Sequence, residues 1–107
     1  MMSRRVDRVN VLMRQEISRV LANELKDPRL SPIVSITRVA TSGDLRHAKV
    51  YVSVLGGAAE QKSSMTALKS AAGFIHHVMR NQLKMRAVPS LTFYLDDSIA
   101  RAPKSWR

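Results

Sequence analysis

The sequence contains no cysteine, and this absence excludes disulfide bonds and thiolate chemistry. Long apolar runs are also missing, since none approaches the roughly 20 residues that a membrane-spanning helix needs. The first residues, MMSRRVDRVNV, have no continuous apolar segment of the signal-peptide kind. These absences favour a cytoplasmic protein, and we expect no membrane partner.

Acidic residues are scarce. The chain has 8 of them against 18 lysines and arginines, which gives a net charge of +10 in 107 residues. So large an excess repels itself in a compact state, and a polyanion such as nucleic acid is the first partner to expect. A well-solvated charged surface is the alternative.

The length suits one domain, and an apolar share of 45% is sufficient for a globular core. We expect a single domain over residues 1–107, with a core of about 4–98 and a tail of 99–107.

No arrangement of side chains supports catalysis or metal binding. His76 and His77 are adjacent in a helical pattern and point about 100° apart, so they cannot readily chelate one ion. Asp96 and Asp97 are consecutive in a strand pattern and face opposite sides. We therefore expect no enzyme, no metal and no cofactor. A nuclease or RNA-modifying enzyme with a histidine as general base is the rival hypothesis.

Apolar residues spaced by three and four predict a first helix from Ser3 to about Leu25. Ser3 suits the N-cap, and Pro28 disfavours helix before it. Three arginines, Arg4, Arg5 and Arg8, crowd the start of this helix, where the macrodipole is already positive. That placement predicts an external anion, with a solvated polar face as the alternative.

Two β-branched stretches, IVSITRVAT (33–41) and RHAKVYVSVLG (46–56), flank the turn SGDL and predict a β-hairpin. In the second stretch, alternate residues from Ala48 to Val54 should share a buried side. The segment LTFYLDD (91–97) predicts a third strand, with Phe93 on its apolar side. The intervening GGAAEQKS is expected to be a flexible connection.

A further helical pattern runs from about Gln61 to Arg86 and contains Gly73 in its middle. The expected order of elements is therefore α-β-β-α-α-β. Helical elements on one face of a three-stranded sheet form a two-layer α+β domain.

Gly73 lies among basic residues of this helical pattern. Lys69, Gly73, His76, Arg80 and Lys84 share one arc of the wheel, away from the apolar arc. Bare backbone at this point would let a phosphate reach peptide N–H groups while the cations neutralise it. A bend would add free N–H donors at a new helix start. Close packing of another element at Gly73 is the alternative.

Four blocks of the sequence resemble the bacterial ribosome-binding factor A family in order and spacing, from about Arg5 to Ser98. They are KDPRL, SGDLRHAKVYVSVLG, AAGFI and MRAVPSLTFYLDDS. The resemblance implies a type II KH-like domain in which an interrupted helix with Ala-x-Gly replaces the GxxG loop. The matching positions here are Ala71, Ala72 and Gly73.

The resemblance also implies a non-enzymatic, cold-shock-associated assembly factor. It would bind free 30S subunits and 16S rRNA, assist late maturation and 5′-end processing, and leave before translation. A general RNA-binding or protein-docking module is the alternative. Many members carry a longer polar C-terminal extension, whereas this sequence stops at Arg107. A monomer is expected.

The predicted RNA-binding residues combine the basic start of the first helix with the Gly73 region. They are Arg4, Arg5, Arg8, Lys69, Ala71, Ala72, Gly73, His76, Arg80, Lys84 and Arg86. Arg38, Arg46 and Lys49 are secondary candidates.

Overall fold

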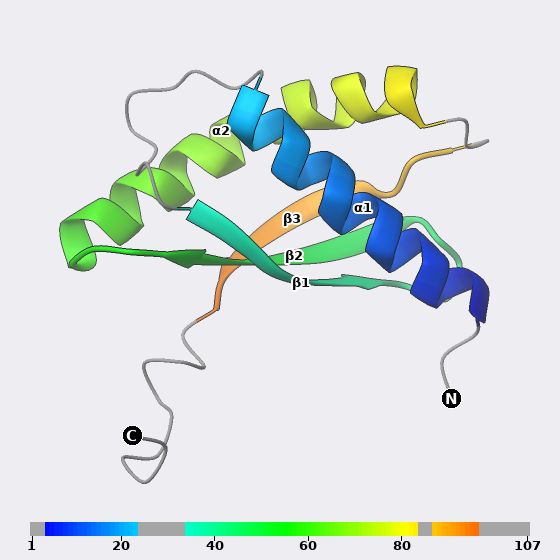
Figure 1. Cartoon of the computed structure of the whole chain (residues 1–107), viewed down its shortest axis with the longest axis horizontal. Coiled ribbons are helices and arrows are strands. Elements are labelled where there is room, and N and C mark those ends of the chain that lie inside the picture. The colour runs from blue at the N-terminus through cyan, green and yellow to red at the C-terminus, as the bar shows by residue number, and fades with distance from the viewer. Residues whose placement is uncertain (1–3, 24–33, 84–86, 97–107) are drawn as a thin grey trace, which may run out of the picture.

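The computed structural model describes residues 4–23, 34–83 and 87–96. They form α1 (Arg4–Asn23), β1 (Val34–Thr41), β2 (His47–Val54), α2 (Ala58–Gln82) and β3 (Ser90–Leu95). Figure 1 shows both helices on one side of the three-stranded sheet, with no described helix on the other side. The predicted two-layer α+β class is confirmed.

The sheet has the order β1-β2-β3. Strands β1 and β2 form an antiparallel hairpin, whereas β3 pairs with β2 in parallel. A parallel neighbour requires a long crossover, and α2 supplies it. The predicted alternation in β2 is confirmed, because all four residues expected on one side are buried: Ala48, Val50, Val52 and Val54.

The core lies between this sheet side and the two helices. Phe93 on β3 is 2% exposed, and it belongs to one cluster with Ile17 of α1 and Ile75 of α2. The buried side of α1 carries the predicted apolar residues Val6, Val9, Met13, Ile17 and Val20. Within the described ranges, neither helix has the length and apolar character needed to cross a membrane. The predicted end of the first helix, Leu25 to Pro28, lies outside the described residues.

The observed order is α-β-β-α-β, because the two expected helical elements are one continuous helix, α2. Gly73 costs the helix only about 1 kcal/mol relative to alanine. The buried residues Leu68, Ile75 and Met79 lie on both sides of that position, and their packing outweighs the cost. The helix also begins earlier than predicted, at Ala58 after the N-cap Gly57. Alanines there favour helix over a flexible connection.

A β-bulge in β1 changes which side chains face the core. Ile36 pairs with Val52, but Arg38 pairs with Tyr51, so the register shifts by one residue between them. Thr37 is the extra residue, and its hydroxyl donates to the Asp96 carboxylate at 2.6 Å. Ile36 is therefore buried while Arg38 is exposed on the opposite side of the sheet.

Candidate nucleic-acid interface

An exposed basic stripe runs along α2. Lys69, Gly73 and Arg80 are all exposed, as their common arc in the sequence predicts. Lys62 is exposed as well and precedes Lys69 by seven residues, which is close to two helical turns. We call Lys62, Lys69, Gly73, His76 and Arg80 the α2 stripe. Sequence reasoning missed Lys62, although the seven-residue spacing was available as a signal.

Gly73 is not required by packing. A Cβ atom at this position would meet nothing within 4 Å, and the backbone is helical. The alternative that another element packs closely against Gly73 is therefore wrong for the described fold. Because α2 is continuous, no second helix start with free N–H donors opens there. The glycine instead leaves a smooth, side-chain-free position between Lys69 and Arg80.

Ala71 and Ala72 are half-buried and pack against the core cluster. They support the stripe from beneath and add little to its exposed surface.

His76 makes a tertiary contact. Its Nε2 atom donates to the carbonyl oxygen of Val88 at 2.9 Å, since a carbonyl can only accept. This bond ties α2 to the segment that leads into β3. His77 is exposed, and its Nε2 lies 3.5 Å from the Asn81 amide nitrogen. Of these two histidines, His76 therefore bonds to a segment outside α2, whereas His77 contacts a residue of α2 itself.

The three arginines at the start of α1 are exposed but face different ways. Arg4 and Arg8 border an open hollow of about 410 Å³ whose other walls include the exposed Val11 and Leu12. Arg5 borders a separate hollow of about 570 Å³. The structure therefore divides the predicted arginine cluster between two surfaces.

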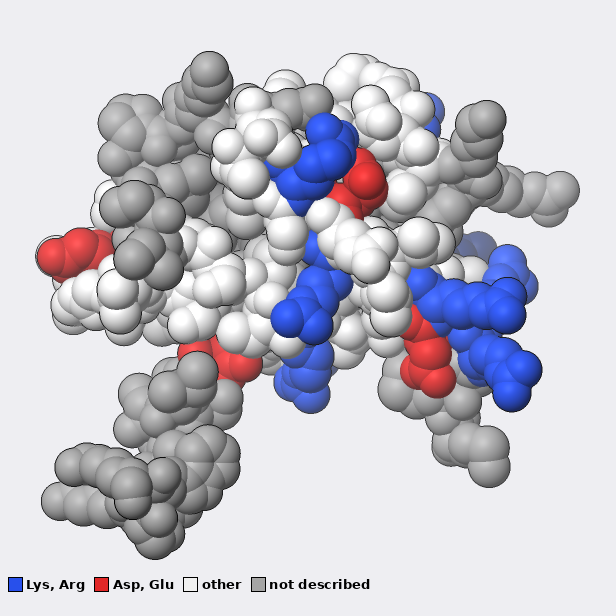
Figure 2. Space-filling model, viewed as in Figure 1, with Lys and Arg blue, Asp and Glu red and all other residues white. Residues whose placement is uncertain are grey.

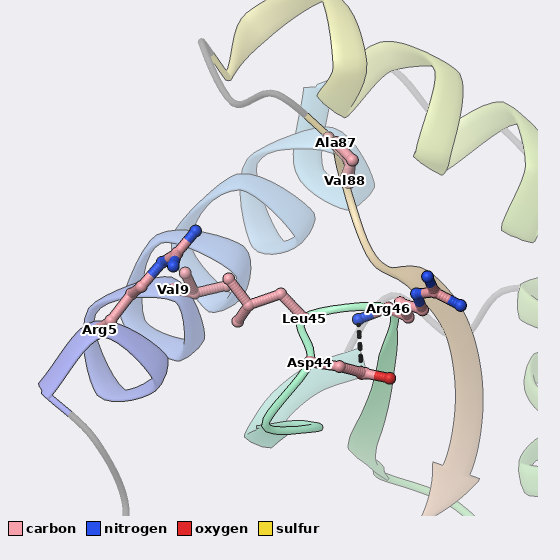
Figure 3. Close-up of a pocket in the computed structure, with 7 residues that line it drawn as sticks. All are labelled: Arg5, Val9, Asp44, Leu45, Arg46, Ala87 and Val88. Carbon is pink, nitrogen blue, oxygen red and sulfur yellow. Dashed lines mark hydrogen bonds between the residues drawn. The ribbon is translucent and has the colours of Figure 1, made fainter.

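The hollow beside Arg5 lies between α1, the β1–β2 turn and the segment before β3. In Figure 3 the guanidinium groups of Arg5 and Arg46 lie on opposite sides of it, with Leu45 pointing toward Val9 between them. Leu45 has a φ of 61°, a left-handed conformation that is rare for a leucine. Its N–H donates to the Ser42 carbonyl at 2.9 Å, which helps to hold the turn.

Asp44 is the acidic member of this hollow. Hydrogen bonds from the Ser42 hydroxyl and the Arg46 backbone N–H lower the pKa of Asp44 below its ordinary value of 3.8. The charged carboxylate therefore stabilises the β1–β2 turn by accepting these hydrogen bonds. Two arginines remain at the edge of the hollow.

The arginine end of α1 and the last turns of α2 lie at the same end of the molecule (Figure 1). Val88 lines the hollow beside Arg5 and accepts the His76 bond, so it joins the two regions. Figure 2 shows basic side chains gathered over the beginning of α1 and along the middle of that face, with fewer acidic ones among them. Lys84 and Arg86 lie outside the described residues.

Within residues 4–23, 34–83 and 87–96, no group of three or more histidine, cysteine or acidic side chains is placed to hold a metal ion. What the described surface does offer is exposed cations beside bare backbone. Such an arrangement can neutralise phosphates and let them approach closely.

Comparison with known sequences gives one consistent match. The family model Ribosome-binding factor A matches residues 5–106. A ribosome-binding factor A from Acetivibrio thermocellus is 48% identical over 97 residues, which cover 91% of this chain and 79% of that protein. One from Dictyoglomus thermophilum is 43% identical over 106 residues, covering 99% and 88%.

Solved structures agree in fold. The solution NMR structure of a candidate ribosome binding factor A from Thermotoga maritima gives a TM-score of 0.79 at 31% identity, covering 97% of this chain and 98% of that one. A homology model of the Thermus thermophilus factor, fitted into a cryo-electron-microscopy map of its 30S complex, gives 0.68 at 22% identity, covering 82% and 91%. At 22% identity the Thermus likeness supports the fold alone.

Proposed function

The chain belongs to the ribosome-binding factor A family, and on that premise we propose that it binds the free small ribosomal subunit through 16S rRNA. We further propose that it assists late maturation of the subunit, including 5′-end processing of 16S rRNA and growth in the cold. It acts as a monomer in the cytoplasm and leaves before translation begins.

Two kinds of support carry the choice of partner. The relatives are named for ribosome binding. The net charge of +10 suits an RNA surface. A ribosomal particle is the polyanion that satisfies both.

Gly73 is the main evidence for where the proposed contact surface lies. A glycine in mid-helix lowers stability, and here no neighbouring group needs the missing side chain. It is flanked on the same stripe by Lys69 and Arg80, both exposed. We infer that an RNA backbone lies across α2 at this point, with its phosphates between the two cations.

The proposed action is electrostatic, with no covalent step. Cations on α2 and at the start of α1 would hold a segment of rRNA in a position that blocks premature joining of subunits. If about six phosphates are contacted, affinity should fall roughly 10³-fold or more between low and moderately raised salt.

Gly73→Glu provides the test of this surface. A carboxylate at the centre of the stripe should weaken binding to purified small subunits by about tenfold or more, because it repels phosphate and covers the backbone. Gln15→Glu is the matched control, since Gln15 is exposed on α1 and the substitution changes net charge equally. Pelleting with small subunits measures both. Equal binding by the two variants would remove α2 from the interface.

A protein-docking function has one observation in its favour. Val11 and Leu12 are 55% and 44% exposed beside Arg4 and Arg8. A ribosomal protein could cover this apolar patch. Nuclease treatment of the complex separates the two functions, because a protein-held factor stays bound after the RNA is digested.

A further inference from the structure

The side of the sheet away from the helices carries a group of basic, aromatic and hydroxyl side chains. We call it the open face, and it is formed by side chains of all three strands: Arg38, Lys49, Tyr51, Thr92 and Tyr94. The α2 stripe does not include this face, because both helices pack on the other side of the sheet (Figure 1).

Three of these side chains form a stack. The Arg38 guanidinium carbon lies 4.2 Å from the centroid of the Tyr51 ring. The rings of Tyr51 and Tyr94 are 5.6 Å apart between centroids and inclined by 28°. Arg38 and Tyr94 stand on β1 and β3, the two neighbours of β2. The order across the sheet is therefore Arg38, Tyr51, Tyr94.

This order leaves the outer face of Tyr94 uncovered by the sheet. β3 is an edge strand of the described sheet, so no further strand stands beyond it. Tyr94 is 42% exposed. Tyr51 stacks on one side of this ring, and no strand of the described sheet lies on its other side.

We propose that the outer face of the Tyr94 ring binds an unpaired base of single-stranded RNA, as the next layer of this stack. The proposal rests on the RNA-binding function above and adds a second contact surface to it. Every base has a flat π-face, so such stacking tolerates any sequence. Unpaired bases on aromatic side chains are a common mode of single-stranded RNA recognition.

The charges on the open face indicate on which side of the stack the RNA backbone would pass. Lys49 is exposed one row from Tyr51 and pairs with Thr92. Asp96 lies toward the opposite end, where its carboxylate accepts from Thr37. Phosphates are attracted to the Lys49 end and repelled from the Asp96 end. We therefore expect the RNA backbone to pass on the side of Lys49, with the Thr92 hydroxyl within reach of a 2′-OH.

Sheet stabilisation is the competing explanation, since cross-strand aromatic pairs stabilise sheets. The two roles need different properties of residue 94. A cover for the sheet needs apolar bulk, which leucine supplies. A platform for base stacking needs a planar ring, which phenylalanine preserves and leucine does not.

The experiment uses a six-nucleotide single-stranded RNA carrying 2-aminopurine, whose fluorescence is quenched on stacking. Tyr94→Phe should bind within about twofold of the parent chain and retain the quenching. Tyr94→Leu should bind about tenfold more weakly and lose it. Equal affinity and equal quenching for the leucine variant would overturn the proposal. Leu91→Val, on the side of β3 that packs against the core, is the control for disturbance of β3 and should retain quenching.

A measurement on the unaltered chain covers the case in which the leucine variant does not fold. Photocrosslinking with a 5-bromouridine oligonucleotide should place the adduct on Tyr94, identified by mass spectrometry. Adducts confined to α2 would overturn the proposal.

Small-subunit pelleting separates this inference from the proposed function. If subunits bind but Tyr94 makes no difference to the oligonucleotide, only the stacking site fails. If the chain binds neither subunits nor oligonucleotide, the proposed function fails and the stacking site with it. Loss of nuclease-resistant subunit binding in Tyr94→Leu would assign the face to a protein and also overturn the proposal.

Discussion

Gly73 is a single residue at which stability and the proposed function oppose each other. It is exposed in mid-helix, and a methyl group there would meet no neighbour. Alanine would therefore fit, and the helix would gain from it. Such stabilising substitutions can cost function, and this would be the case here if RNA contacts the bare backbone.

Gly73→Ala should raise the free energy of unfolding by about 0.5–1 kcal/mol, and Tm by about 4 °C. It should also weaken small-subunit binding, because the methyl group keeps phosphate off the backbone. Thermal unfolding and pelleting measure the two effects. Ser70→Ala, at an exposed neighbouring position, should stabilise without weakening binding. Undiminished binding by Gly73→Ala would show that the backbone is not contacted.

Asp44 gives a second effect at the scale of one residue, with a defined pH dependence. Its pKa is lowered in the fold by the Ser42 hydroxyl and the Arg46 N–H, so its charged form contributes stability above the ordinary value of 3.8. That contribution is lost as pH falls through the lower folded pKa. Asp44→Asn should therefore reduce Tm at pH 7, and the reduction should shrink as pH falls below 3.8. A difference in Tm that stays constant as pH is lowered from 7 to well below 3.8 would contradict this.

Sequence reasoning was least complete at the scale of residues. The exposed cations Lys69 and Arg80 could be placed by helical spacing, but the bond from His76 to Val88 could not, because it joins distant segments. The side of the sheet on which Arg38 lies could not be predicted either, because Ile36 and Arg38 would face the same side of an unbroken strand. Only the bulge at Thr37 sends them to opposite sides of the sheet.

The elements themselves followed closely from apolar periodicity. Strand β2 and the buried side of α1 are as the spacing predicts, because burial selects register in strands and helices alike. The division of α2 was not observed, since continuous packing outweighs the cost of one glycine. The parallel pairing of β3 with β2 was not predicted, because strand order depends on contacts that no local pattern records.

Two neighbouring residues of α2 test its packing. Ile75→Ala should lower the free energy of unfolding by about 2–5 kcal/mol, because Ile75 is fully buried and its removal leaves a cavity. Phe74→Ala should cost less than about 1 kcal/mol, since Phe74 is 46% exposed. Urea denaturation gives both values. Equal losses would mean that α2 is rotated so that Ile75 does not face the core more than Phe74 does.

At the scale of the whole molecule, positive charge is spread over the start of α1, the α2 stripe and part of the open face. Three of the described acidic residues hold local structure: Asp44 accepts bonds in its turn, Asp96 accepts from Thr37, and Glu16 pairs with Arg19 at 2.9 Å. The net charge of +10 remains the reason to expect a polyanionic partner. Composition alone could not distinguish RNA in general from one ribosomal particle.

Co-sedimentation of the purified chain with small subunits, large subunits and joined ribosomes, across a salt series, tests whether the chain selects the free small subunit. We predict binding to free small subunits alone, falling roughly 10³-fold or more as salt rises from about 50 to 200 mM. Equal binding to all three particles would contradict it, because the charge would then act without selecting the small subunit.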